Sequence, residues 1–224
     1  DIIILSRGTL TTRIESGLAG YWHFDEGTGT KSYDSSGFGN NGTLTNNPLW
    51  QSVSLCKAGT CVSFNGSNNF INGSPSNIQN ITSAAMTIAA WVYPITRQSL
   101  GDRDMIFRQN GYLTITPTGK LSAYFYGLAS PGYHDSNAVA PLNNWTHLAV
   151  TYDSSSGNIN FYINGALDRT VTTNGTISNG QNNFVIGGEP ACCNRFFNGT
   201  IDEIRVYNRA LTAAEILNHY NDLK

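Results

Sequence analysis

The feature that most constrains this chain is the alternation of apolar and polar residues with a period of two, interrupted by turn-forming dipeptides. Successive side chains of a β-strand point to opposite faces of its sheet, so this pattern predicts strands with one buried face. The dipeptide Asn164-Gly165, which lies between two such segments, predicts a tight β-hairpin. Strands are expected over residues 87–93, 120–126, 145–152, 158–163, 166–171, 183–187 and 199–207. Many short strands indicate an all-β fold, an antiparallel two-sheet sandwich or jelly roll.

One short helix is expected, at the C-terminus. Thr212 and Glu215 have the spacing of a capping box, in which the threonine is the N-cap and the glutamate reaches back to it. No proline-rich or charged linker interrupts residues 17–224, so these residues are predicted to form one domain. Residues 1–16 are predicted to be an N-terminal tail or the remnant of a linker.

The charge composition argues against two classes of partner. Charged residues make up only 12% of the chain, and 13 Lys and Arg against 15 Asp and Glu give a net charge of -2. Because no basic field gathers phosphates, nucleic acid is not expected as a partner. No stretch approaches the roughly 20 apolar residues that span a bilayer, so membrane insertion by this fragment is not expected either.

The four cysteines fall into two close pairs. Cys56 and Cys61 bracket a short loop, and this spacing predicts a local disulfide. Cys192 and Cys193 are adjacent, which leaves a vicinal disulfide, two free thiols or a metal site as alternatives, although neither pair has the usual Cys-x-x-Cys spacing of zinc sites. The even number of cysteines and the low charge favour an extracellular or cell-surface location, with the export signal expected outside this fragment.

Two acidic regions suggest a cation site. Asp25 and Asp34 lie in a glycine-rich loop after an aromatic segment, and such a loop offers the oxygen ligands that calcium prefers. The alternative is turn chemistry, in which Asp and Asn side chains close Asx-turns.

Alternation places the distant Asp202 on the same face as Ile204 and Val206. A carboxylate on an apolar face costs several kcal/mol unless it is paired, so an arginine or a cation must compensate it.

A series of motifs along the chain resembles the laminin-G-like jelly-roll domains of the concanavalin A-like lectin/glucanase superfamily. The motifs are residues 18–27, 34–37, 41–44, 90–92, 145–153, 161–165 and 199–211, and the resemblance covers nearly the whole chain from Gly17 onward. It implies two antiparallel sheets stacked as a jelly roll and one structural calcium that joins the first loop to the last strand. By this resemblance, the calcium ligands are Asp25, Asp34, Gly39, Asn41, Gly42 and Asp202.

Some members of this superfamily hydrolyse polysaccharides, which requires two carboxylates held about 5–9.5 Å apart. On a β-strand, a Glu-x-Asp-x-Glu run meets this requirement, and the chain contains no such run. The four histidines lack metal-ligand spacing, and the Gly-x-Ser-x-Gly motif of serine hydrolases is missing from the sequence. Catalysis is therefore not expected.

Two loops combine aromatic with polar side chains and are the candidate ligand site. They contribute Tyr133, His134 and Asp135 from one loop and Cys192, Cys193, Asn194, Arg195 and Phe196 from the other. Together they are expected to form a stacking platform with polar flanks. The alternative is that Phe196 and Phe197 cap the core while the cysteines order a long loop.

The sequence thus predicts a non-catalytic binding module of the cell surface or extracellular space, with a glycan as the expected ligand of a lectin-like site. The first alternative is a protein-protein adhesion or structural module of a larger surface or pilus-type protein. The second is an enzyme that acts on glycans.

Overall fold

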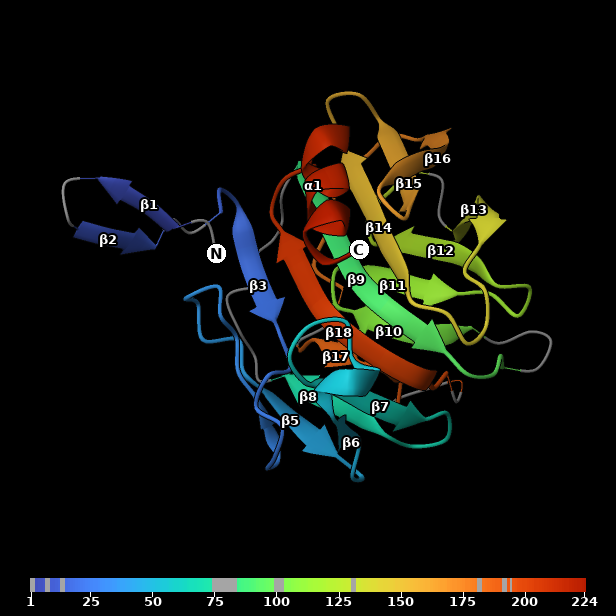
Figure 1. Cartoon of the computed structure of the whole chain (residues 1–224). Coiled ribbons are helices and arrows are strands. Elements are labelled where there is room, and N and C mark those ends of the chain that lie inside the picture. Colours follow the sequence, from blue (N-terminus) through green and yellow to red (C-terminus); the bar gives the residue numbers. More distant parts are fainter. Residues whose placement is uncertain are drawn as a thin grey trace.

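The computed structural model describes residues 3–6, 9–12, 15–73, 84–98, 103–129, 132–180, 183–190, 193 and 195–224. In this part of the chain, two antiparallel β-sheets pack face to face and one α-helix lies at the C-terminus, as the sequence predicts (Figure 1). The architecture is that of a jelly-roll sandwich.

The first sheet has eight strands in the order β13-β12-β11-β10-β17-β8-β5-β4. In chain order these are β4 (Lys31–Ser32), β5 (Gly42–Thr45), β8 (Phe70–Gly73), β10 (Asp104–Arg108), β11 (Gly111–Ile115), β12 (Lys120–Phe125), β13 (His134–Val139) and β17 (Val185–Ile186). The strand β17 pairs with β10 on one side and with β8 on the other, and both partners are far from it in sequence. The middle of the sheet therefore depends on long-range pairing.

The second sheet has the order β16-β15-β14-β9-β18-β7-β6, and a further strand, β3, also pairs with β18. Its strands are β3 (Leu18–Trp22), β6 (Leu49–Gln51), β7 (Cys61–Asn65), β9 (Ala85–Pro94), β14 (Thr146–Asp153), β15 (Asn158–Ile163), β16 (Ala166–Thr172) and β18 (Asn198–Tyr207). The predicted hairpin at Asn164-Gly165 is confirmed, because it joins β15 to β16 with positive φ angles of 50° and 79°.

The core lies between the inner faces of the two sheets. Alternation along β14 directs Leu148 and Val150 into it, and alternation along β9 does the same for Ile88 and Val92. The largest fully buried side chains include Trp22, Phe24, Phe107, Tyr152, Phe161, Phe184 and Phe197. The aromatic residues that are abundant in the sequence therefore serve mainly to fill this layer.

The helix α1 (Ala213–Leu223) covers the outer face of the second sheet (Figure 1). Its predicted capping box is confirmed, since Thr212 accepts a hydrogen bond from the Glu215 amide and the Glu215 carboxylate accepts one from the Thr212 amide. Ile216 packs there with Ala89 and Ala149, two residues that point away from the main core. The helix thus gives the second sheet a smaller apolar layer on its outer side.

Three short elements complete the described structure. Strands β1 (Ile3–Ser6) and β2 (Thr9–Thr12) form a two-stranded hairpin in the segment expected to be a tail. The 3-10 helix η1 (Val53–Leu55) follows β6 and leads into the Cys56–Cys61 loop. None of the described helices has the length and apolar character that crossing a membrane requires.

His147 on β14 is buried under α1, where its ring lies 5.4 Å from that of Trp91 and 6.4 Å from that of Tyr220 between ring centroids. Burial lowers its pKa from 6.5 to about 3. The unfolded chain therefore binds a proton at His147 that the folded chain excludes, so stability falls as the pH falls through this window. We expect this residue to lower the free energy of unfolding by about 2 kcal/mol between pH 7 and pH 5.

The variant His147→Gln has no titrating group at this position, so its midpoint of urea unfolding should fall less between pH 7 and pH 5 than that of the native protein. His147→Asn serves as an independent second variant. An unchanged pH slope in both variants would show that His147 does not carry this dependence.

Candidate functional site

Four tyrosines gather on the outer face of the first sheet, at β11 and β12 and beside β13. Leu113 on β11 and Ala123 on β12 point into the core, so Tyr112 and Tyr124, their neighbours in sequence, point outward. Adjacent rings of the group lie 5.0 to 6.0 Å apart between centroids. We call Tyr112, Tyr124, Tyr126 and Tyr133 the tyrosine face. Tyr112 is buried, whereas the other three are partly exposed.

A buried carboxylate ties two arginines to this face. Glu189 is 4% exposed, and its Oε1 and Oε2 each accept a hydrogen bond, at 3.2 Å, from Arg108 Nη1 and Arg195 Nη1 respectively. Arg195 Nη1 also donates to the Tyr133 hydroxyl at 3.0 Å, and the Tyr112 hydroxyl donates to Glu189 Oε1 at 3.5 Å. Because these groups hold one another, their polar atoms are fixed before any ligand arrives.

A second ion pair also lies beside Tyr133. Arg103 Nη1 lies 3.2 Å from Asp135 Oδ1, and the hydroxyl of Ser122 donates to the same carboxylate oxygen at 2.6 Å. The guanidinium carbon of Arg103 lies 4.2 Å from the centroid of the Tyr133 ring, and that of Arg195 lies 5.6 Å from it. Tyr133 is therefore flanked by two cations.

The phenols of Tyr112 and Tyr133 remain protonated at physiological pH because burial raises their pKa. The pKa of Tyr133 is raised to about 12. The face therefore presents neutral hydroxyl donors and acceptors, aromatic rings and guanidinium groups. Its two carboxylates, Glu189 and Asp135, are each held by arginine.

Among the predicted ligand residues, the structure brings Tyr133, Asp135 and Arg195 together. His134 pairs with Ala123, whose side chain is in the core, so it faces away from Asp135. Phe196 is 6% exposed, so its ring packs inside the protein rather than facing solvent.

The adjacent cysteines Cys192 and Cys193 are only partly described. Cys193 takes part in a disulfide bond and adopts a positive φ of 70°. Cys192 and Asn194 lie outside the described residues, so their predicted role in the ligand site stays a prediction.

Sequence reasoning missed several residues of this surface. They are Tyr112, Tyr124, Tyr126, Arg103, Arg108 and Glu189. Tyr124 and Tyr126 lie two positions apart on a predicted strand, so their spacing already placed two tyrosines on one face. The pairing of Arg108 with Glu189, however, joins residues that are 81 positions apart, and no local pattern indicates it.

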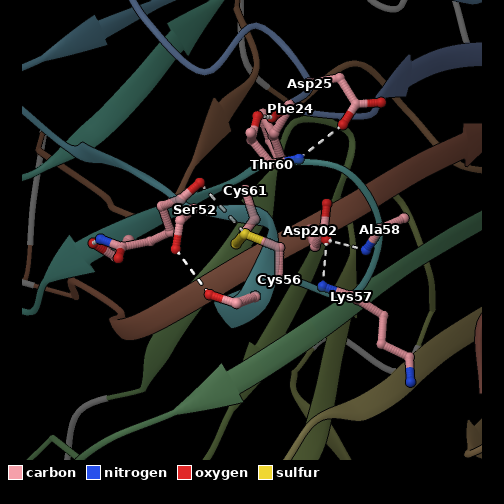
Figure 2. The surroundings of a disulfide bond; sticks show 12 residues. Phe24, Asp25, Ser52, Cys56, Lys57, Ala58, Thr60, Cys61 and Asp202 are labelled. Atoms are coloured by element: carbon pink, nitrogen blue, oxygen red, sulfur yellow. Dashed lines mark hydrogen bonds between the residues drawn. A yellow bond between two sulfur atoms is a disulfide. The ribbon is translucent and has the colours of Figure 1, made fainter.

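The predicted disulfide between Cys56 and Cys61 is confirmed, and it closes a loop that binds two carboxylates (Figure 2). Asp202 Oδ2 accepts hydrogen bonds from the amides of Lys57 at 2.9 Å and Ala58 at 3.1 Å. Asp25 Oδ1 accepts one from the amide of Thr60 at 2.9 Å. The loop thus connects the turn after β3 to the last strand, β18.

The prediction that Asp202 shares a face with Ile204 and Val206 is wrong. The residue pairs with Trp91 and lies on the outer side of the second sheet, whereas Ile204 and Val206 point into the core. The cause is a register shift between Asp202 and Arg205, where Glu203 has a positive φ of 53°. Asp202 is still fully buried, because the Cys56–Cys61 loop covers it.

Asp34, another predicted calcium ligand, belongs to a network of hydrogen-bonded turns. Its Oδ1 accepts from the amides of Tyr21 and Ser36, both at 2.9 Å. Its Oδ2 accepts from the amide of Asn40 at 2.8 Å. These contacts are the Asx-turn chemistry that the sequence left as the alternative to a cation.

The other predicted ligands divide into two groups. The Gly39 carbonyl accepts from the Asn41 amide at 2.8 Å, the Asn41 side chain accepts from the Asp34 amide at 2.9 Å, and Gly42 lies within β5. By contrast, Asp202 keeps one buried oxygen, Oδ1, that has no hydrogen-bond partner in the part of the chain that the structure describes. In the described part of the chain, no group of three or more His, Cys, Asp or Glu side chains is arranged to hold a metal. The calcium site stays a prediction.

Comparison with known proteins supports the architecture. Residues 65–217 match a laminin G family model described as the concanavalin A-like lectin/glucanases superfamily. Adhesion G-protein coupled receptor D1 of Homo sapiens is 30% identical over 115 residues, which are 50% of this chain and 13% of the receptor.

Two solved structures show similar folds. Domain 4 of AbnA, a GH43 extracellular arabinanase from Geobacillus stearothermophilus solved in complex with arabinotriose, has a TM-score of 0.67 and 24% identity, over 90% of this chain and 97% of that chain. The binding domain of botulinum neurotoxin DC in complex with rat synaptotagmin II has a TM-score of 0.72 and 14% identity, over 95% of this chain and 53% of that chain. At these identities the likeness concerns the fold alone.

The Cys56–Cys61 loop should contribute measurably to stability. The disulfide spans a sequence separation of 5. Closing so short a loop is worth about 2 kcal/mol. We expect the double variant Cys56→Ser/Cys61→Ser to lose at least about this much free energy of unfolding in urea titrations. A chemical reductant would also act on the disulfide of Cys193. The double variant avoids this because it leaves Cys192 and Cys193 unchanged. Equal stability of variant and native protein would contradict a structural role for the loop.

Proposed function

Because this chain belongs to the laminin G-like family of the concanavalin A-like lectin/glucanases superfamily, we propose that it is a non-catalytic binding module that takes a carbohydrate on the tyrosine face. The observation that carries the proposal is the gathering of four tyrosine rings around the fixed polar groups of Glu189 and Arg195.

The chemistry of this surface suits a sugar. A sugar ring has apolar C–H faces and a rim of hydroxyls, so it binds to aromatic side chains flanked by donors and acceptors. Tyr124, Tyr126 and Tyr133 are partly exposed and supply rings with hydroxyls, while the guanidinium group of Arg195, held by the buried Glu189, supplies charged donors. Because the Glu189 ion pairs already hold these side chains, little conformational entropy is lost on binding. The arabinotriose complex of AbnA domain 4 is consistent with this use of the fold.

The same surface supports the absence of catalysis. Glycoside hydrolysis needs one carboxyl group as an acid and a second as nucleophile or base. At the tyrosine face, Glu189 is bound by Arg108 and Arg195, and Asp135 is bound by Arg103. Carboxylates in such pairs serve to orient side chains and ligands.

A protein partner is the second candidate function, and a different surface favours it. Leu49, Val53 and Leu55 are 62%, 65% and 60% exposed and follow one another along the edge strand β6 and η1. Exposed apolar side chains at a sheet edge are a common protein-binding feature. The human adhesion receptor and the synaptotagmin II complex of the toxin domain are consistent with this alternative. For either function, the disulfide favours a location outside the cell.

We also propose that calcium stabilises the fold, held at Asp25 and Asp202. The support is the buried Oδ1 of Asp202, which no described residue partners, and the binding of both carboxylates to one loop. Such an ion would stabilise the native state by binding it in preference to the unfolded chain.

The carbohydrate proposal is tested on a glycan array with the native protein and two variants. Tyr124→Ala removes a ring of the tyrosine face and should weaken binding about tenfold, the usual effect of truncating a central contact. Tyr33→Ala is the matched control, because Tyr33 is 58% exposed and lies outside the tyrosine face. Binding that is saturable and lost in Tyr124→Ala supports the proposal. The second candidate would be favoured if no glycan on the array binds and if the native protein captures a surface protein that the Leu55→Ser variant does not capture.

The calcium proposal is tested by thermal unfolding in chelator and in calcium. At about a hundred times its dissociation constant, the ion should raise the midpoint by about 5–10 °C. Asp202→Asn should remove the shift, while Asp222→Asn, on the exposed side of α1, should keep it. No shift and no bound calcium in the native protein would refute the site.

A further inference from the structure

We propose that the carbohydrate bound by the tyrosine face carries a carboxylate, so that the ligand is an acidic sugar rather than a neutral one. This inference rests on the carbohydrate-binding function proposed above. It goes further by naming the ligand class, which follows from the distribution of charge around Tyr133.

The positive charge at this face is unusual for the chain. The whole sequence has a net charge of -2, and only 12% of its residues are charged. Nevertheless, Arg103, Arg108 and Arg195 converge on the tyrosine face. Two carboxylates, Glu189 and Asp135, oppose these three guanidinium groups, which leaves a local excess of one positive charge.

The hydrogen bonds show the same imbalance. Both oxygens of Glu189 already accept from arginine, and Asp135 Oδ1 accepts from Arg103 and Ser122. On the donor side, the Nε atoms of Arg108 and Arg195 are buried and have no hydrogen-bond partner among the described residues. Arg108 is 5% exposed, so it is held at the base of the face. The donors that a ligand can contact are therefore those of the partly exposed Arg103 and Arg195, and an acceptor-rich anion complements them.

The position of the cations decides where the anion would bind. The Arg103 and Arg195 side chains are 22% and 21% exposed, and both guanidinium groups lie over Tyr133. A sugar placed against the tyrosine rings would thus bring its substituents next to two planar guanidinium groups. Planar guanidinium matches the planar, two-oxygen geometry of a carboxylate.

The experiment compares glycans that differ only in one charge. The probes are printed glycans with a free uronate or sialate carboxylate, the same glycans as methyl esters, and sulfated glycans without carboxylates. The native protein should bind the free acid about tenfold or more tightly than its ester, the usual effect of one charge-assisted contact. Added salt should reduce this preference.

Three variants assign the preference to the guanidinium groups. Arg103→Gln and Arg195→Gln should each bring the affinity for the free acid close to that for the ester. Because Arg103 pairs with Asp135 and not with Glu189, its variant leaves the Glu189 network intact. Lys120→Gln removes a positive charge at the start of the same strand, β12, and should leave the preference unchanged. Unfolding midpoints measured alongside confirm that each variant is folded.

The outcomes separate the two proposals. Equal or tighter binding of the methyl esters, or binding of sulfated glycans alone, overturns the carboxylate inference and leaves the carbohydrate function in place. If no glycan of any class binds, the carbohydrate function itself fails, and this inference fails with it.

Discussion

The packing of two sheets around one apolar layer is the constraint on which the rest of this structure depends. Trp22 lies at its centre, with its ring 4.5 Å from Phe184 and 6.1 Å from Phe107 between centroids. The indole N–H donates to the carbonyl of Asn40 at 2.9 Å, so the one polar atom of this side chain is satisfied. Because each sheet gives one face to this layer, the chemistry of the molecule is confined to the outer faces and the loops.

The two outer faces are used differently. On the second sheet, α1 and the Cys56–Cys61 loop cover the strands and bury polar groups such as His147 and Asp202. On the first sheet, the region around β11 and β12 carries partly exposed tyrosines instead. Covered polar groups stabilise or destabilise the fold according to their partners, whereas partly exposed ones are available to a ligand. This difference is why we propose the first sheet as the location of the binding site.

Most of the fold could be predicted from sequence because its signals are local. Alternation predicted seven of the strands, namely β9, β12, β14, β15, β16, β17 and β18. Asn164-Gly165 predicted the hairpin, Thr212 and Glu215 predicted the helix cap, and the five-residue separation of Cys56 and Cys61 predicted the disulfide. The candidate site was predicted only in part. Tyr133, Asp135 and Arg195 come together as expected, but Glu189, which links the arginines, gains its role from Arg108 on a distant strand.

The sequence by itself determined the fold class, the family and those strands of the sandwich whose alternation is regular, because a period of two specifies which side of a regular strand is apolar. Only the tertiary structure decided the environment of Asp202, since one bulge at Glu203 moved it to the outer face. It also decided the charge at the tyrosine face. Contacts between strands depend on strand order and register, and these are set by long-range packing that no local pattern encodes.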